Sequence, residues 1–244
     1  MSPKNKQILN CIENLYPLSN VESDYNTNGI NVPRVTKIIS RCIHNEGLMS
    51  WANSLGFRHK SYRDTLNHAA SIGSDTHLAI DTFLEYTDTE DIHLSYEESN
   101  NAYLSFRRWY DDVSRATEGN IKILLHEETL VHRYFGGTLD GLYEINGKKY
   151  IIDYKTSNHI TFNYCIQIAA YIFMLRELID INIDGIIILQ LSKNSVEYNE
   201  FMLSMDKENE RIFLEQCEDT FISMLYYYYN LYSIEREFKK LYRE

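Results

Sequence analysis

The chain is poor in cysteine, and the few cysteines that it has are scattered. Its 244 residues include four, at positions 11, 42, 165 and 217, and no two of them form a Cys-x-x-Cys pair. This spacing argues against a zinc knuckle and against a disulfide framework, because both depend on closely spaced or paired cysteines. We expect reduced thiols, most of them buried.

Long apolar runs and linker-like stretches are also missing. No run approaches the ~20 apolar residues that cross a bilayer, and the N-terminal MSPKNKQILN lacks the apolar segment of a signal peptide. With three prolines and 10 glycines, the sequence offers no obvious linker. We therefore expect a single-domain intracellular, cytoplasmic protein with no membrane contact.

An excess of positive charge is absent as well. The net charge of −11 argues against a nonspecific nucleic-acid binder, because Lys and Arg neutralise phosphates. The acidity is local, however: nine acids and no Lys or Arg lie between Arg63 and Arg107, whereas residues 120–176 hold six basic and five acidic residues. The acidic segment 64–98 is a candidate surface for a protein partner, although a solvated helix and loop is the commoner meaning of such a stretch.

What the sequence does contain is a change of period near residue 118. A helical pattern before it gives way to strand patterns after it, which divides the chain into a helical region, 1–118, and a core with a C-terminal helix, 119–244. The turn Asn146-Gly147 favours a tight hairpin. The order predicts an α/β fold with a mixed sheet flanked by helices. We expect helices over 4–15, 35–43, 47–57, 62–86, 98–117, 163–180 and 207–241, and strands over 121–131, 137–145, 148–155, 183–192 and 196–204.

Charged residues interrupt the apolar pattern of two neighbouring strands. Asp140 ends the apolar stretch of one of them, and Asp153-Tyr154-Lys155 ends the next. Asp153 and Lys155 lie on one face because strand side chains alternate. Two carboxylates at neighbouring strand ends suit Mg²⁺ or Mn²⁺, with water and a substrate phosphate completing the coordination shell. The amine could help deprotonate a water or stabilise charge on phosphorus. An isolated Asp-x-Lys is weak evidence, so the neighbouring residues matter.

Polar residues also stand on apolar helix faces. Gln167 and Tyr171 lie four residues apart on the helix predicted over 163–180, and His77 follows Gly73 by four residues on an earlier helix. The alternative for Tyr171 is a core aromatic residue whose hydroxyl is hydrogen-bonded. The alternative for His77 is a hydrogen-bonded core histidine. A buried Gln167 needs polar partners, which a carboxylate-rich sheet end would supply. Gly73 would let another backbone approach the helix closely.

Taken in their order along the chain, these motifs resemble those of the PD-(D/E)xK nuclease superfamily. They most resemble its RecB-like branch of exonucleases. The match covers about residues 32–175 and comprises GxxxH at 73–77, an upstream acid, GGTLD at 136–140, IIDYKTS at 151–157 and QIAAY at 167–171. The segment VPRVTKIIS, followed by a Trp-containing helix, is similar to phage and mitochondrial single-strand DNA exonucleases, with Arg34 where serine is usual. The resemblance implies a restriction-endonuclease-like core.

The resemblance also implies a metal centre. Asp140 and Asp153 would be the main ligands of Mg²⁺ or Mn²⁺, joined by the backbone carbonyl of Tyr154. Lys155 would position or activate the attacking water. Glu127 would be the upstream acid of the motif, which either binds the metal directly or contacts one of its ligands. Glu128, on the opposite face of the same strand, is the alternative for this role.

Further roles follow from the same resemblance. His77 would assist at the metal or the phosphate, and Gln167 and Tyr171 would orient the lysine and grip the DNA backbone. Thr156 and Ser157 would contact the substrate. Relatives with an iron–sulfur cluster carry a C-terminal group of cysteines, and here the last 79 residues contain only Cys217, so we expect no cluster.

The expected function is a Mg²⁺- or Mn²⁺-dependent deoxyribonuclease, an exonuclease that acts on single-stranded DNA ends in recombination, repair or phage DNA processing. A DNA endonuclease with the same site and a catalytically silent DNA- or partner-binding module are the alternatives. The silent module would lack a ligand or the lysine, and here every motif position is filled. The aromatic residues Trp51, Phe57 and Tyr62 offer stacking surfaces for bases, although core packing is their commoner use.

Overall fold

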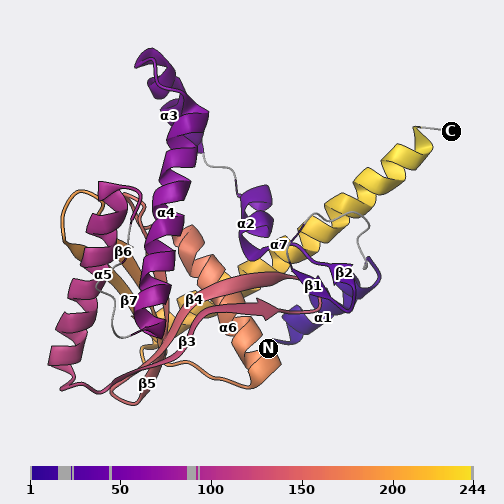
Figure 1. Cartoon of the computed structure of the whole chain (residues 1–244). Coiled ribbons are helices and arrows are strands. Elements are labelled where there is room, and N and C mark those ends of the chain that lie inside the picture. Colours follow the sequence, from indigo (N-terminus) through magenta and orange to yellow (C-terminus); the bar gives the residue numbers. More distant parts are fainter. Residues whose placement is uncertain are drawn as a thin grey trace.

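A computed structural model describes residues 2–15, 23, 25–43, 46–86, 92 and 94–242. Figure 1 shows the elements in sequence colours. The helices are α1 (Pro3–Glu13), α2 (Val35–Cys42), α3 (Glu46–Phe57), α4 (Tyr62–Glu85), α5 (Glu97–Ala116), α6 (Phe162–Ile179) and α7 (Glu208–Leu241). The strands are β1 (Asn26–Thr27), β2 (Ile30–Asn31), β3 (Ile121–Val131), β4 (Gly136–Ile145), β5 (Lys148–Lys155), β6 (Gly185–Leu191) and β7 (Tyr198–Ser204).

The central sheet has five strands in the order β3-β4-β5-β6-β7. All neighbours are antiparallel except β5 and β6, which are parallel, so the sheet is mixed. A parallel pair needs a long crossover, and α6 supplies it. The predicted fold class, α/β with a mixed central sheet, flanking helices and a helical N-terminal part, is confirmed.

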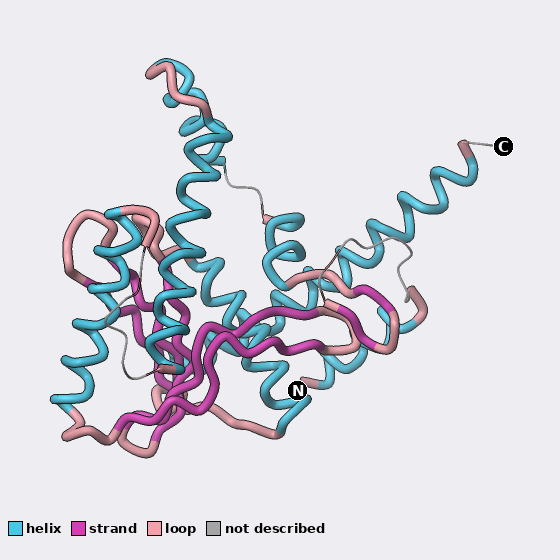
Figure 2. The backbone as a smooth tube through the Cα atoms, in the orientation of Figure 1, coloured by secondary structure: helices cyan, strands magenta, loops and turns pink. Residues whose placement is uncertain are grey.

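Helices cover both faces of the sheet (Figure 2). Alternating side chains of β5 enter two different cores: Ile151 packs with residues of α6, α7 and α2, whereas Ile152 packs with residues of α4 and α5. Among the described residues, α6 is the one helix long and apolar enough to span a membrane, but most of it is buried inside the protein. Its apolar character is therefore explained by its place in the core.

The β4–β5 hairpin forms where the sequence predicts it. Asn146 and Gly147 both have positive φ angles, 50° and 75°, as the tightest hairpin turns require. β4 pairs with β3 along its whole length, but with β5 only from Gly141 onward. The site residues converge at the sheet edge that opens where β4 and β5 separate, before Gly141 on β4 and after Ile152 on β5.

Some features differ from the predictions. The short hairpin β1–β2 was not expected, although its turn, Asn28-Gly29, is the same dipeptide as the turn of the β4–β5 hairpin. All four cysteines are free, but Cys11 is exposed and Cys42 is only partly buried, so the expectation of mostly buried thiols holds for Cys165 and Cys217 alone. The acidic segment 64–98 lies in part outside the described residues, and its described N-terminal part belongs to α4.

Candidate active site

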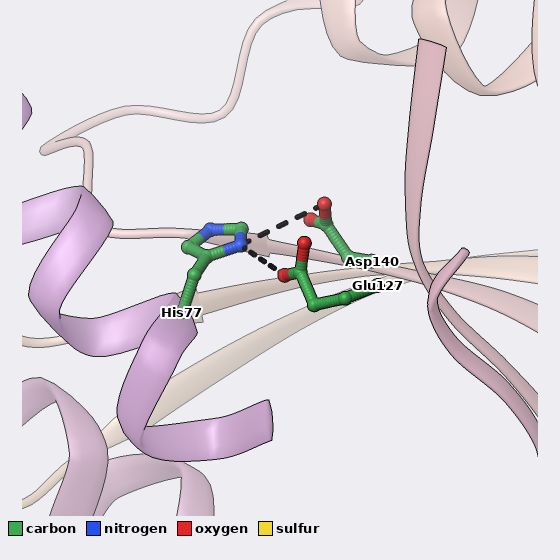
Figure 3. A group of neighbouring side chains, drawn as sticks. All are labelled: His77, Glu127 and Asp140. Carbon is green, nitrogen blue, oxygen red and sulfur yellow. Dashed lines mark hydrogen bonds and ion pairs between the residues drawn. The ribbon is translucent and has the colours of Figure 1, made fainter. Parts of the chain in front are cut away.

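Three predicted site residues from three elements meet at this sheet edge. His77 of α4, Glu127 of β3 and Asp140 of β4 each offer one ligand atom, and these atoms lie within 4.8 Å of one another. Figure 3 shows the imidazole facing both carboxylates. His77 Nδ1 lies 3.1 Å from Glu127 Oε1 and 3.7 Å from Asp140 Oδ1, and Nε2 lies 3.2 Å from the carbonyl oxygen of Tyr154. Four of the five predicted metal-binding groups are thus neighbours.

The backbone of β3 decides which glutamate faces the group. Glu127 has a φ angle of 44°, a left-handed conformation that is unusual for a non-glycine residue inside a strand. Because the regular alternation is broken, both His126 and Glu127 contact α4, through Asp81 and His77. Glu128 is exposed. Glu127 is therefore the acid at the site, and the alternative of Glu128 is excluded by geometry.

The two carboxylates change the protonation of His77. Burial by itself lowers the pKa of this imidazole, but Asp140 and the hydrogen bond to Glu127 outweigh burial, and the pKa is raised to about 9. A protonated ring donates from both nitrogens, which matches its two partners, Glu127 and the Tyr154 carbonyl. An imidazolium thus balances the negative charge of the carboxylates.

Asp140 does not end its strand, contrary to the prediction that both carboxylates stand at strand ends. It lies within β4, one residue before the pairing with β5 begins. The carboxylate is buried, and its Oδ2 accepts a hydrogen bond of 2.9 Å from the backbone N–H of Tyr154. This bond ties β4 to the end of β5 and leaves Oδ1 directed toward His77.

Asp153 and Lys155 form a buried ion pair beside the group of three. Lys155 Nζ lies 2.5 Å from Asp153 Oδ2, which confirms that the two side chains share a face. Burial raises the pKa of Asp153 to about 6, Lys155 opposes this rise, and Asp140 adds to it. The pKa of Lys155 is raised, because Asp153 and Asp140 outweigh its burial. The lysine therefore carries its charge at neutral pH.

Gln167 and Tyr171 of α6 extend this pair. The Gln167 amide donates to Asp153 Oδ1 at 3.4 Å and to the Tyr171 hydroxyl at 3.3 Å. Tyr171 is buried against Gly137, where a Cβ atom would lie 2.6 Å from its Cε1. The second glycine of GGTLD thus makes room for the tyrosine ring, which fixes the hydroxyl that receives the Gln167 amide.

Thr156 and Ser157 continue the chain after Lys155 and line a polar cavity of about 400 Å³ at the ends of β5 and β6. Ser157 Oγ is already engaged, since it donates to the His159 carbonyl and accepts from the Tyr164 hydroxyl, each at 3.0 Å. A Cβ atom on Gly73 would lie 3.7 Å from Thr156 Oγ1, an ordinary contact with a side chain. The expected close approach of another backbone to Gly73 is therefore wrong.

A larger cavity, of about 710 Å³, opens at the group of three. Its walls come from α2, α4 and β3, and the α4 residues lie on one helical face. The lining residues are Arg34, Thr36, Gly73, Ser74, His77, Leu78, Asp81 and Glu127. The site is thus open to a ligand larger than an ion.

Several residues near the site were not predicted from the sequence. Asp81 and His126 form an ion pair of 2.6 Å next to that of His77 and Glu127. Tyr25 bonds through its hydroxyl to Thr138 Oγ1 at 3.0 Å. Lys155 Nζ lies 5.0 Å from the centroid of the Tyr164 ring. Asp81 lies one helical turn after His77, and this spacing could have identified it from the sequence. The other residues lie far in sequence from the residues that they contact, so no local pattern indicates them.

The donor set fits a hard divalent cation. Two carboxylates and a backbone carbonyl are the oxygen ligands that Mg²⁺ and Mn²⁺ prefer, and the His77 ring would add a fourth donor only after a bound ion displaced one of its protons. Asp153 lies outside the group of three, and its part as a ligand stays a prediction. His77, Glu127, Asp140 and the Tyr154 carbonyl are the groups that would hold the ion.

Comparisons with known proteins identify no family. No family model and no curated protein matches the chain. A solved structure described as the crystal structure of SSO0001 is similar over 90% of this chain and 85% of its own, at 13% sequence identity and a TM-score of 0.29. This similarity is too low to support a shared fold or function, so any functional assignment depends on the site residues themselves.

Proposed function

We propose that the chain is a Mg²⁺- or Mn²⁺-dependent deoxyribonuclease of the PD-(D/E)xK type, acting as an exonuclease on single-stranded DNA ends. The observation that supports the proposal is the convergence of His77, Glu127 and Asp140 beside a buried Asp153–Lys155 pair. An ordinary surface Asp-x-Lys would have neither the burial nor the second carboxylate group. The order of the motifs in the sequence supports the same assignment.

A divalent ion bound at such a site polarises the scissile phosphate and lowers the pKa of a coordinated water. The chain's own part is electrostatic and positional. Because the pKa of Lys155 is raised, its ammonium stays charged and stabilises negative charge that develops on the phosphate, rather than accepting a proton from water. Gln167 holds the Asp153 carboxylate that faces this ammonium, and so orients the lysine.

The test is cleavage of end-labelled linear and circular DNA, single- and double-stranded, with Mg²⁺, with Mn²⁺ and with EDTA. The exonuclease proposal expects metal-dependent shortening of linear single strands and no attack on circles. Cleavage of circular single strands would assign an endonuclease. Metal-dependent binding without cleavage of any substrate would assign a silent binding module.

The lysine gives a sharper test. Lys155→Ala is expected to reduce turnover by about 10²-fold or more, the range for loss of one charge-stabilising group, while the chain still folds and binds DNA, at a lower stability because the buried Asp153 loses its partner. Lys122→Ala is the matched control, since Lys122 is exposed at the other end of the sheet and pairs with Glu144. Near-normal cleavage by Lys155→Ala would refute the mechanism.

A further inference from the structure

Helix α3 and the first part of α4 form a projection that stands away from the sheet (Figure 1). We call Met49–Arg63 the α3–α4 tip; it comprises most of α3, the turn at 58–61 and the start of α4. The turn is closed onto α3, because the Leu55 carbonyl accepts the backbone N–H groups of Arg58 and Lys60 at 3.0 and 2.9 Å. Ser61 caps α4 through Asp64 N–H. The tip is therefore a defined structure.

The tip exposes large apolar side chains. Phe57 is 87% exposed, Met49 75% and Trp51 37%. The Trp51 ring packs edge-on against Tyr62 with centroids 5.5 Å apart, which ties α3 to the start of α4. Phe57 and Trp51 thus do not have the core role that aromatic residues usually have, and burying them requires something from outside the described structure.

The charge of the tip is opposite to that of the chain. Residues 49–63 contain Arg58, Lys60 and Arg63 and no acid, in a protein with a net charge of −11. None of these three cations forms an ion pair with a residue that the structure describes. Unpaired cations among exposed aromatic rings are the combination that binds single-stranded nucleic acid, since the rings stack on bases and the cations contact phosphates.

The tip and the candidate active site are joined by one straight element. Arg63 and His77 lie 14 residues apart on α4, which corresponds to about 21 Å along the helix at 1.5 Å per residue. The exposed side chains of α4 between them include the larger Leu66, Asn67 and His68. Nearer to His77, Ala70 and Ser74 are small and exposed, and leave space for a strand. Gly73 and Ser74 then line the cavity at the group of three.

From these observations we infer that the α3–α4 tip is a stacking platform for single-stranded DNA, which holds the strand several nucleotides from the scissile phosphate. Phe57 and Trp51 stack on bases, and Arg58, Lys60 and Arg63 contact the backbone. That the strand runs from the tip to the candidate active site rests on the proposed function. The platform itself binds DNA without metal and without cleavage.

Tryptophan fluorescence gives a direct test. The chain has two tryptophans: Trp51, and Trp109, which is 0% exposed and donates its indole N–H to Glu200. In EDTA, an oligothymidine of roughly 16 nucleotides, near the upper site size of single-strand-binding folds, is expected to quench the emission of Trp51 until binding saturates. Trp51→Phe is expected to keep DNA binding, measured by anisotropy, and to lose the quenching.

Variants of the tip measure its share of the binding. Phe57→Ala is expected to weaken binding about 5- to 150-fold, which corresponds to the loss of one stacked base. Phe238→Ala is the matched control, since Phe238 is exposed on α7. Arg63→Ala is expected to reduce the slope of log K against log salt by about 0.7, the value for one phosphate contact on a single strand.

The outcomes separate this inference from the proposed function. Quenching without metal-dependent cleavage supports the platform and refutes the nuclease. Cleavage without quenching, or equal affinity of wild type and Phe57→Ala, overturns the platform and leaves the nuclease. Equal quenching by a duplex of the same length overturns the single-strand assignment.

Discussion

A divalent ion held by Glu127 and Asp140 should stabilise the fold, and the size of this effect can be worked out. A ligand that binds only the folded state at about 100 times its Kd contributes about 2.7 kcal/mol. In a chain of this length 1 kcal/mol raises Tm by about 2–4 °C, so a rise of about 5–10 °C in saturating Mn²⁺ or Mg²⁺ relative to EDTA is expected.

Variants of the two carboxylates should reduce this shift by different amounts. The Asp140 side chain is 10% exposed and that of Glu127 31%, so solvent screens the charge of Glu127 more. Glu127→Gln is expected to weaken binding about tenfold, about 1.4 kcal/mol, and to lower the shift by about 3–5 °C. Asp140→Asn should remove the shift. Because each variant is compared with itself in EDTA, effects on the metal-free fold cancel.

Glu128→Gln is the matched control, because it is the neighbouring acid on the exposed side of β3. It should show the wild-type shift. The assay is thermal unfolding monitored by fluorescence or circular dichroism over a metal titration. An unchanged shift in Asp140→Asn, or a loss of the shift in Glu128→Gln, would refute a metal site at these carboxylates.

Three further variants test other parts of the structure. Asp153→Asn should abolish metal-dependent cleavage and destabilise the fold, since it leaves a buried ammonium without its nearest counter-charge; recovery of the full rate in excess Mg²⁺ would contradict this role. Gly137→Ala should cost about 1–3 kcal/mol in denaturant unfolding because its Cβ would clash with Tyr171, whereas Gly56→Ala, with open space around it, should cost nothing. Burial lowers the pKa of His132 to about 4, against about 6.5 in an unfolded chain, so the unfolded chain binds more protons between these values. The free energy of unfolding contributed by the neutral ring is complete above pH about 6.5 and falls by about 3 kcal/mol as the pH drops to about 4. In a His132→Phe variant, the free energy of unfolding measured over the same pH range should lack this decrease.

The order of helices and strands was predictable because each depends on residues close in sequence. The apolar α6, the alternating β5 and the turn Asn146-Gly147 carry their signals within a few residues, and each formed where it was expected. The same local rule would have found β1–β2 from Asn28-Gly29. The motif residues Asp140, Asp153 and Lys155 could also be selected from the sequence, since carboxylates and an amine among apolar strand residues need a reason.

The tertiary structure alone decided which residues far apart in sequence contact one another. The left-handed backbone of Glu127 directs this acid, rather than Glu128, toward His77 of α4. The packing of α4 against β3 turned His77 into the partner of two carboxylates. The exposure of Phe57 follows from the way α3 projects on α4 beyond the sheet. A sequence specifies local conformation through short-range sterics and hydrogen bonding, whereas charge pairing and exposure depend on which surfaces meet when the chain packs.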